Sequence, residues 1–268
     1  MTEGSFDMDR TAGGSWALIT GASSGLGVEF ARILAAQRLN LVLAARGIDA
    51  MDVLAAELRT AHGIQVVIEG IDLAAPGAAV ELKRRTDARG LRIDLLVNNA
   101  GYGVHGHFLD ADRNTVSRML QLNTVALTEL THLYAQDMAA RGHGRILLVA
   151  SLLGYMATPE YAAYAATKSY VLAFGEALHD ELAPSGVTVT VLSPGITATA
   201  FADTSGHSVS ATLKLMMMQP RAVAETGIRA LFAGRASVVP GIANKLSAFS
   251  TRLSPRSVHR RVMQALMA

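Results

Sequence analysis

The sequence predicts an α/β fold with a single doubly wound parallel sheet of about seven strands and helices on both faces. Short runs rich in β-branched residues and leucine alternate with longer segments whose apolar residues recur at helical spacing. The chain has 268 residues, half of them hydrophobic, which suits one domain with a sizeable core. Strands that alternate with helices pair in parallel through right-handed crossovers, so helices cover both faces of the sheet.

The first elements are a strand, a glycine-rich turn, a helix and a second strand. Residues 16–20 (WALIT) and 39–45 (LNLVLAA) are apolar strands. Between them, Phe30 and other apolar residues at helical spacing predict a helix over residues 27–38. The alternation then continues, with helices expected at 49–61, 77–88, 111–139 and 159–182, and strands at 64–73, 94–99, 144–151 and 188–194.

The chain divides into a tail, one domain and an extension. Residues 1–14 are polar and contain glycine, which predicts a flexible N-terminal tail without the features of a signal peptide. The domain is expected over residues 15–241, with a substrate loop at about 200–220. A helix over residues 222–234 and a strand over residues 236–241 are the last elements expected in this domain.

The C-terminal extension, residues 242–268, is basic and amphipathic, with two short segments separated by Pro255. It carries five lysine and arginine residues and no acidic residue, so the rest of the chain is mildly acidic and no nucleic-acid partner is expected. Three roles fit the extension: docking on a neighbouring subunit, covering its own substrate cleft, or lying on an anionic membrane surface. Packing on a subunit or on its own domain is favoured over the membrane.

Composition also excludes several chemistries. The absence of cysteine excludes thiol nucleophiles, disulfides and cysteine-ligated zinc. No run of eighteen apolar residues occurs, so no transmembrane helix is expected and the cytoplasm is the expected location. His105 and His107 form a His-x-His pair, but no third ligand stands at a suitable spacing, so no metal site is predicted.

The stretch ALITGASSGLG, residues 17–27, fits two different chemistries. Its G-x-S-x-G matches the nucleophile elbow of hydrolases, in which Ser23 would be the nucleophile. Its glycines also match a dinucleotide turn, where Gly21 allows the tight turn, Gly25 a close approach to pyrophosphate, and Gly27 close helix packing. The turn follows the first strand rather than a central one, and no later histidine stands in a distinctive setting. The dinucleotide turn is therefore favoured, with Ser23 as a phosphate neighbour.

The second strand bears on the choice of dinucleotide. It ends at Arg46, with no acid in the two positions before Gly47. An acid there would bond the ribose hydroxyls of NAD, whereas arginine can pair with the 2′-phosphate of NADP. NADP(H) is therefore favoured over NAD(H), although an isolated arginine at a strand end is commonly no more than a solvated side chain.

A tyrosine and a lysine supply the candidate chemistry. Tyr164 and Lys168 are four residues apart, so they share one face of a helix that Thr158 as N-cap and Pro159 at the first position would begin. A phenol has a pKa near 10, and an adjacent ammonium favours its ionised form. Ser151 ends the preceding strand, where α/β sheets bind their ligands.

With these motifs the chain resembles the short-chain dehydrogenase/reductase family, in its compact single-domain oxidoreductase branch, over nearly all of residues 15–241. The resemblance implies a Rossmann-type domain. The matching motifs are Thr20-Gly21-x-x-x-Gly25-x-Gly27, Asp72, Asn98-Asn99-Ala100-Gly101, Asn123, Ser151, Tyr164-x-x-x-Lys168, and Pro194-Gly195 followed by Thr199.

The resemblance also implies roles for the matching residues. Tyr164 would exchange a proton with the substrate oxygen, and Lys168 would lower the pKa of Tyr164 and bind the nicotinamide ribose. Ser151 would polarise the same oxygen, Asn123 would hold a water that links Lys168 to solvent, and Asp72 would contact adenine. The complete set expected to bind the cofactor is Gly21, Ser23, Ser24, Gly25, Leu26, Gly27, Arg46, Asp72, Leu73, Asn99, Ala100, Gly101, Tyr164, Lys168, Pro194, Gly195, Ile196, Thr197 and Thr199.

The sequence therefore predicts an NADP(H)-dependent oxidoreductase that interconverts a carbonyl and a secondary alcohol by hydride transfer. Pliable apolar side chains at Leu213, Leu215 and residues 216–218 suggest an apolar small-molecule substrate, although a core helix or a subunit contact would use the same residues. A homo-oligomer, dimer or tetramer, is expected. The alternatives are a catalytically weak NADP-binding regulatory protein and a serine hydrolase.

Overall fold

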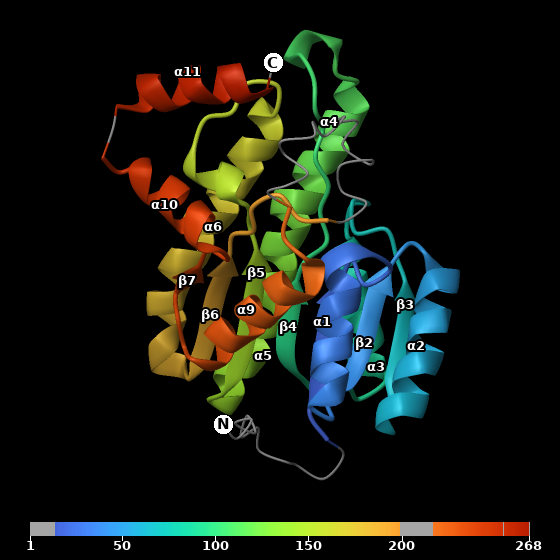
Figure 1. Ribbon diagram of the computed structural model, residues 1–268. Helices are drawn as coiled ribbons and strands as arrows, with labels where there is room; N and C mark the ends of the chain where they lie inside the picture. Colours follow the sequence, from blue (N-terminus) through green and yellow to red (C-terminus); the bar gives the residue numbers. More distant parts are fainter. Residues whose placement is uncertain (1–13, 199–216, 254, 268) are drawn as a thin grey trace.

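The computed structural model describes residues 14–198, 217–253 and 255–267 of the chain. Seven parallel strands form one sheet in the order β3-β2-β1-β4-β5-β6-β7, which confirms the predicted fold class (Figure 1). The order reverses between β1 and β4, the point where doubly wound sheets bind ligands at the carboxyl ends of their strands. The strands are β1 (Trp16–Thr20), β2 (Asn40–Ala45), β3 (Val66–Gly70), β4 (Ile93–Asn98), β5 (Gly144–Val149), β6 (Val187–Leu192) and β7 (Ser237–Val238).

Helices cover both faces of the sheet (Figure 1). Every residue of β1, β2 and β4 is buried, which explains why these strands read as continuous apolar runs rather than as alternating patterns. One face packs against α1 (Gly25–Ala36), α2 (Ile48–His62) and α9 (Pro220–Phe232). The other face packs against α3 (Ala78–Ala88), α5 (Leu127–Arg141) and α6 (Ala162–Leu182).

Among the described residues, three further α-helices lie beyond these two layers. They are α4 (Arg113–Leu120), which precedes α5, and the C-terminal pair α10 (Ile242–Ser250) and α11 (Arg256–Met267). None of the helices within the described ranges is both long and apolar enough to cross a membrane.

The start of α6 differs from the prediction. The helix begins at Ala162 with Tyr161 as its N-cap residue, so the expected start at Pro159 with Thr158 as the cap is wrong. Glu160 adopts a φ of 63°, which a right-handed helix cannot contain. The Thr158 hydroxyl donates to the carbonyl oxygen of Met156 at 3.4 Å instead of capping the helix.

The helix expected over residues 111–139 is divided. Asp112 caps α4, because its carboxylate accepts a hydrogen bond from the Thr115 N–H at 2.7 Å. A π-helical segment, Gln121–Ala126, then joins α4 to α5 and contains the fully buried Asn123. Such segments are frequent at functional sites, and hydrophobic periodicity does not reveal them.

The strand expected over residues 64–73 is shorter than predicted, since β3 ends at Gly70. The carboxylate of Asp72 accepts a hydrogen bond from the Ala74 N–H at 3.1 Å, which turns the chain away from the sheet. Asp72 and Leu73 therefore lie in a loop at the carboxyl edge of the sheet.

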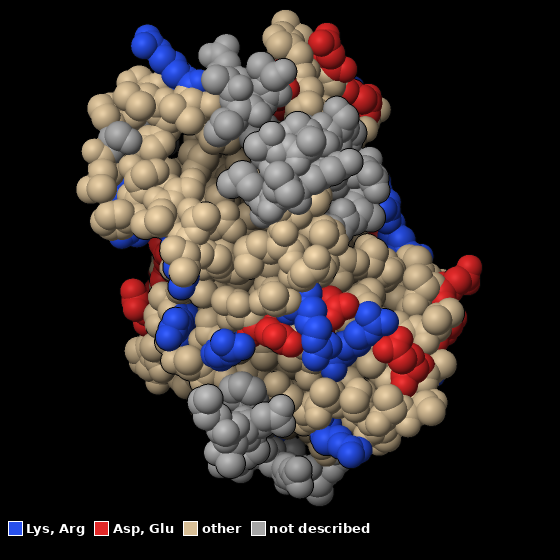
Figure 2. Space-filling view, in the orientation of Figure 1, with Lys and Arg blue, Asp and Glu red and all other residues tan. Residues whose placement is uncertain are grey.

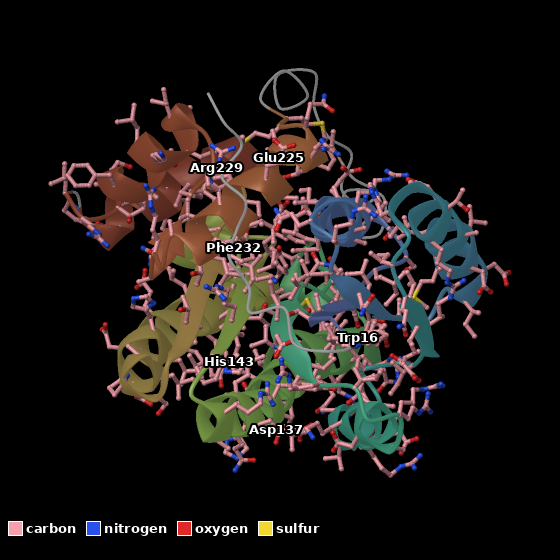
Figure 3. All side chains as sticks on the ribbon, turned by 90° about the horizontal axis from the view of Figure 1, so that it is seen from below. Trp16, Asp137, His143, Glu225, Arg229 and Phe232 are labelled. Carbon is pink, nitrogen blue, oxygen red and sulfur yellow. The ribbon has the colours of Figure 1, made fainter. Side chains whose placement is uncertain are left out.

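The opposite edge of the sheet is held together by a buried carboxylate. Asp94, at the start of β4, accepts a hydrogen bond from the backbone N–H of Trp16 at 3.4 Å. The same carboxylate lies 3.1 Å from the guanidinium of Arg92 and 3.6 Å from the ring of His143. Figure 3 views this edge from below and labels Trp16 and His143. These contacts join the beginnings of β1, β4 and β5, at the edge of the sheet opposite the carboxyl ends of its strands.

Gly27 gives a stability prediction. A Cβ on Gly27 would lie 2.1 Å from the carbonyl oxygen of Gly21, so the first turn of α1 tolerates no side chain there. We expect Gly27→Ala to lower the free energy of unfolding by about 2–3 kcal/mol, measured by urea denaturation. Gly77→Ala is the control, because Gly77 has a φ of +74° but nothing within 4 Å, and it should cost only about 1 kcal/mol. Equal losses in the two variants would contradict this account of Gly27.

Candidate active site

A cavity of about 1200 Å³ opens at the carboxyl edge of the sheet, beside the reversal of strand order. This volume exceeds the roughly 300–1,000 Å³ of a site for one drug-sized ligand, so it suits a dinucleotide together with a substrate. Most of the predicted site residues line it: Gly21, Ser23, Ser24, Gly25, Leu26, Arg46, Asp72, Leu73, Asn99, Ala100, Gly101, Ser151, Tyr164, Lys168, Pro194, Gly195, Ile196 and Thr197.

Two predicted residues that the structure describes do not line this cleft. Gly27 lies behind the glycine turn, where it allows the helix to pack on Gly21. Asn123 is fully buried beneath the cleft. Thr199 lies outside the described residues.

Hydrogen bonds between the ends of β1 and β4 fix the glycine turn. The buried Thr20 hydroxyl accepts hydrogen bonds from the N–H groups of Asn99 and Ala100, both at 3.0 Å. The Asn99 side-chain amide donates to the carbonyl oxygen of Thr20 at 2.9 Å. The structure shows that the Asn99 amide holds the turn in place, and the cofactor contact expected of Asn99 stays a prediction.

The glycine turn fits a pyrophosphate. Gly21 has a φ of +68°, and a Cβ there would lie 2.9 Å from the Asn99 amide nitrogen. Ser24 is the N-cap residue of α1 without a side-chain cap bond, and the first turn of α1 contains no acidic residue. Because the turn faces the cavity, the N–H groups at the start of α1 can bind an anion there. The residues present therefore fit the diphosphate of a dinucleotide.

The cleft is polar and charged where the loop after β3 approaches α4. Asp72 forms an ion pair with Arg118 of α4, with 2.5 Å between Oδ2 and Nη2. Burial raises the pKa of Asp72. The hydrogen bonds from Arg118 and Ala74 and the charges of Arg118 and Arg46 together lower this pKa by more than burial raises it, so the carboxyl stays ionised. Arg118 and Tyr102 also line the cavity, and nothing in the sequence pattern indicated either of them.

Tyr164 and Ser151 meet on the floor of the cleft. Tyr164 projects from α6 and is 6% exposed, and Ser151 follows β5 at the start of the short 3-10 helix Leu152–Tyr155. Burial raises the pKa of Tyr164 well above its ordinary value, and its hydrogen bond with Ser151 lowers the pKa by less. The phenol is therefore protonated at neutral pH.

Lys168 lies one helical turn beyond Tyr164 on α6, as predicted. Its Nζ donates a hydrogen bond to the carbonyl oxygen of Val149 at 2.8 Å and lies 5.7 Å from the centre of the Tyr164 ring. Burial lowers the pKa of Lys168 to about 8. Burial raises the pKa of Tyr164 by more than its hydrogen bond with Ser151 lowers it, and the expected lowering of that pKa by Lys168 stays a prediction.

Asn123 holds the loop after β4 against α6. Its Oδ1 accepts a hydrogen bond from the Tyr102 N–H at 3.2 Å, and its Nδ2 donates to the Tyr102 carbonyl oxygen at 2.9 Å. The same Nδ2 donates to the hydroxyl of Thr167 at 3.2 Å, and that hydroxyl donates to the Tyr164 carbonyl oxygen at 2.7 Å. Asn123 thus positions the residues around Tyr164, while the water that the resemblance implies stays a prediction.

The remainder of the cleft is largely apolar. Met217 lines it, as expected for the methionine-rich segment, whereas Leu213, Leu215 and Met216 lie outside the described residues. Sequence reasoning missed the other apolar residues of this region, because none belongs to a recognisable motif: Leu152, Leu153, Met156, Tyr161 and Met263.

The C-terminal extension covers part of its own cleft. Ala243, Asn244 and Ser247 of α10 and Met263 of α11 line the cavity. The contact is close, since a Cβ on Gly195 would lie 2.4 Å from the amide nitrogen of Asn244. Covering its own cleft, one of three roles considered for the extension, is therefore a feature of the structure.

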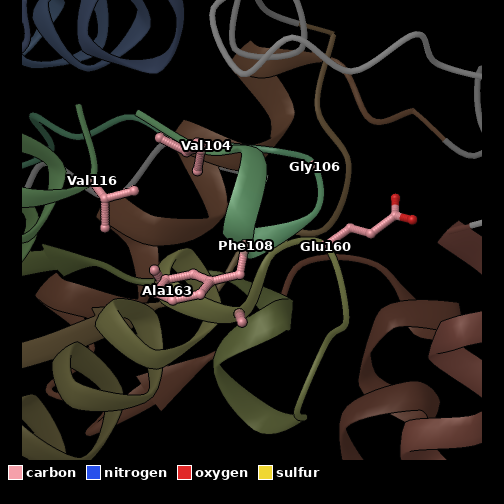
Figure 4. Close-up of a pocket in the computed structure, with 8 residues that line it drawn as sticks. Val104, Gly106, Phe108, Val116, Glu160 and Ala163 are labelled. Atoms are coloured by element: carbon pink, nitrogen blue, oxygen red, sulfur yellow. The ribbon is translucent and has the colours of Figure 1, made fainter. Parts of the chain in front are cut away.

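A second, small pocket lies beside the cleft near Val104, Gly106, Phe108 and Glu160 (Figure 4). Its volume of about 30 Å³ leaves room for little more than a water molecule. His105 of the adjoining loop lies 3.0 Å from the Glu160 carboxylate. Across the described ranges, no group of three or more histidine, aspartate or glutamate residues is arranged to hold a metal ion.

The parallel sheet, the glycine turn and the tyrosine–lysine pair define a Rossmann-type domain with a cleft suited to a dinucleotide. Comparison with known proteins agrees, since residues 15–209 match the family model described as short chain dehydrogenase. The chain belongs to the short-chain dehydrogenase family.

Individual relatives carry related descriptions. A very-long-chain 3-oxoacyl-CoA reductase of Podospora anserina is 34% identical over 190 residues, which are 70% of this chain and 56% of that protein. A short-chain dehydrogenase from Sphingobium yanoikuyae, solved in complex with NADPH, is 31% identical with a TM-score of 0.81 over 89% of this chain and 93% of that one. A bulky-bulky ketone specific alcohol dehydrogenase from Comamonas testosteroni is 29% identical with a TM-score of 0.76 over the same two shares.

The buried lysine gives a pH prediction. Because the folded-state pKa of Lys168 is about 8 and its ordinary value is 10.5, burying the ammonium costs about 3 kcal/mol below pH 8. This cost disappears as pH rises from 8 towards 10.5, where the lysine is neutral in both states. We expect Lys168→Met to be more stable than the wild type at pH 7 in urea denaturation, with the advantage shrinking by pH 10.

Lys245→Met is the matched control, since Lys245 is exposed on α10 and its variant should keep the wild-type dependence on pH. The difference in free energy of unfolding between Lys168→Met and the wild type should change with pH. If it does not, burial of the Lys168 ammonium does not destabilise the fold.

Proposed function

We propose that this protein is an NADP(H)-dependent oxidoreductase that interconverts a carbonyl and a secondary alcohol on an apolar small molecule by direct hydride transfer. One observation carries the proposal: Ser151, Tyr164 and Lys168 converge in the same cleft as the glycine turn. The matched part of the chain spans 56% of the Podospora anserina relative, so the activity of that relative supports the proposal by similarity alone.

The side chains have separable tasks in carbonyl reduction. Bound NADPH would supply the hydride. The protonated phenol of Tyr164 donates a proton to the carbonyl oxygen, and the Ser151 hydroxyl stabilises the charge that develops on the same oxygen. The proton donor is already present at neutral pH because burial raises the pKa of Tyr164.

Lys168 serves as a binding and electrostatic group. One of its three N–H bonds goes to the carbonyl oxygen of Val149, which leaves two for the ribose of the nicotinamide half. With a pKa of about 8, its ammonium stays mostly charged at neutral pH. A charged lysine beside the phenol favours release of the proton from Tyr164 once a substrate accepts it.

The other residues that would bind the cofactor are spread along the cleft. The glycine turn would hold the pyrophosphate, and Arg46, exposed at the end of β2, would pair with the 2′-phosphate of NADP. Asp72 would contact adenine, and residues 194–197 would meet the carboxamide. The NADPH in the Sphingobium yanoikuyae dehydrogenase supports the choice of cofactor.

The substrate half favours apolar molecules. Its lining by Leu153, Met156, Tyr161, Met217 and Met263 offers hydrophobic area with few hydrogen-bonding groups beyond Ser151 and Tyr164. The relatives are described as acting on very-long-chain 3-oxoacyl-CoA and on bulky-bulky ketones, which supports an extended or bulky apolar substrate.

The two alternative functions have less support. A serine hydrolase acting through Ser23 needs a histidine nearby, and no histidine is among the described residues that line the cleft. A catalytically weak regulatory protein has no need of a serine, tyrosine and lysine brought together in a cavity of this size. The expected homo-oligomer and the cytoplasmic location stay predictions.

Tyr164→Phe tests the proposed proton donor. Removing the hydroxyl should lower kcat for any ketone substrate by about 10²–10⁴-fold while NADPH still binds, measured by NADPH absorbance and by fluorescence titration. Tyr170→Phe, on the same helix with its hydroxyl bonded to Thr128 at 2.8 Å, is the control and should keep full turnover. Undiminished turnover by Tyr164→Phe would refute the mechanism.

Arg46→Ala tests the choice of cofactor. Loss of the guanidinium should weaken NADPH binding by roughly 10–100-fold and leave NADH binding nearly unchanged, measured as dissociation constants at fixed salt. Arg113→Ala removes an exposed arginine that does not line the cleft and should alter neither constant. Equal weakening of NADPH and NADH by Arg46→Ala would contradict the 2′-phosphate contact.

A further inference from the structure

The C-terminal helices present an apolar surface away from the protein. Ile242, Leu246, Phe249 and Leu253 recur at helical spacing along α10 and the turn after it, and they are 78%, 64%, 55% and 73% exposed. On α11, Val258 and Val262 are 48% and 51% exposed. We call these six residues the outer face of the extension.

The orientation of α10 is the reverse of that expected for a surface helix. Such a helix normally turns its apolar side to the core and its polar side to water. Here Asn244 and Ser247 line the cleft while the large apolar side chains point outward. Packing within this domain therefore does not explain why the outer face is apolar.

Positive charge surrounds the outer face. Lys245, Arg252, Arg260 and Arg261 are exposed on the same two helices or the turn between them, and residues 242–268 contain no acidic residue. In Figure 2 the surface over α10 and α11, at the upper left, is mostly uncharged with lysine or arginine atoms at its margins. Apolar side chains edged by cations are the pattern of a surface that lies on anionic lipid.

We propose that the outer face of the extension docks on the surface of an anionic lipid bilayer. Its charge argues against a second copy as the occupant, because a symmetric contact would bring two basic, acid-free faces together. Another exposed apolar pair, Phe108 and Leu109, is followed by Asp110 and Asp112, so it lacks this complementarity to lipid.

Docking in this way would also orient the cleft. The side of α10 opposite the outer face lines the cavity, so a bilayer on the outer face lies one helix diameter from the substrate half. The docking itself does not depend on the proposed activity, and its test needs no substrate.

Sedimentation of the full chain with vesicles tests the proposal. We expect binding to vesicles of phosphatidylcholine mixed with phosphatidylserine, and much weaker binding to phosphatidylcholine alone or at high salt. The triple variant Leu246→Ser, Phe249→Ser, Leu253→Ser should lose on the order of 100-fold in partitioning. Lys245→Ser with Arg252→Ser should lose roughly 30-fold on the mixed vesicles.

A matched triple variant controls for the loss of exposed apolar area. Val53, Val80 and Leu109 are 72%, 57% and 83% exposed on other surfaces, and replacing all three with serine should leave vesicle binding unchanged. Unchanged NADPH binding in each variant shows that the chain is folded. Failure of the wild type to bind mixed vesicles overturns the proposal. Equal vesicle binding by the wild type and the outer-face triple variant would also overturn it. So would a wild type that forms dimers but binds no vesicles, if the outer-face variant is a monomer.

Discussion

The whole site depends on the hydrogen bonds that join the carboxyl ends of β1 and β4. The Thr20 hydroxyl and the Asn99 amide connect these strands at the point where the strand order reverses. The glycine turn, the loop after β4 and the start of α1 all leave from that junction, so the groups that would bind the pyrophosphate are placed relative to it. Asp94 joins the same strands at their other ends, so the sheet is fixed at both edges.

The second constraint is the burial of the groups that carry the chemistry. Tyr164 and Lys168 are both nearly inaccessible, and burial moves their pKa values in opposite directions, each toward the neutral form. The phenol becomes a ready proton donor, whereas the lysine charge becomes a cost that the fold must offset. The extended hydrogen bonding of Asn123 and Thr167 holds the backbone around this pair in place.

Sequence reasoning recovered the sheet and the order of elements, and most of its candidate site residues line the cleft, because glycine turns, strand ends and a Tyr-x-x-x-Lys spacing have direct physical meanings. It failed where a local contact decides the outcome. The left-handed backbone conformation of Glu160 keeps α6 from starting before Ala162. The π-helical segment around Asn123 has no signature in hydrophobic spacing. Arg118 and Asn244 reach the cleft only through tertiary packing, so no pattern near them in sequence could have indicated it. The direction of the Tyr164 pKa likewise depends on burial, which spacing does not report.

We propose that this cleft transfers a hydride directly to a carbonyl carbon. The most direct measurement is the fate of deuterium when the protein is incubated with a bulky apolar ketone and NADPH that carries deuterium at the transferring position. The account predicts a secondary alcohol with one deuterium on its carbinol carbon, detected by mass spectrometry. An alcohol without deuterium, or the absence of any alcohol across a panel of apolar ketones to which the NADPH-bound protein binds, would contradict it.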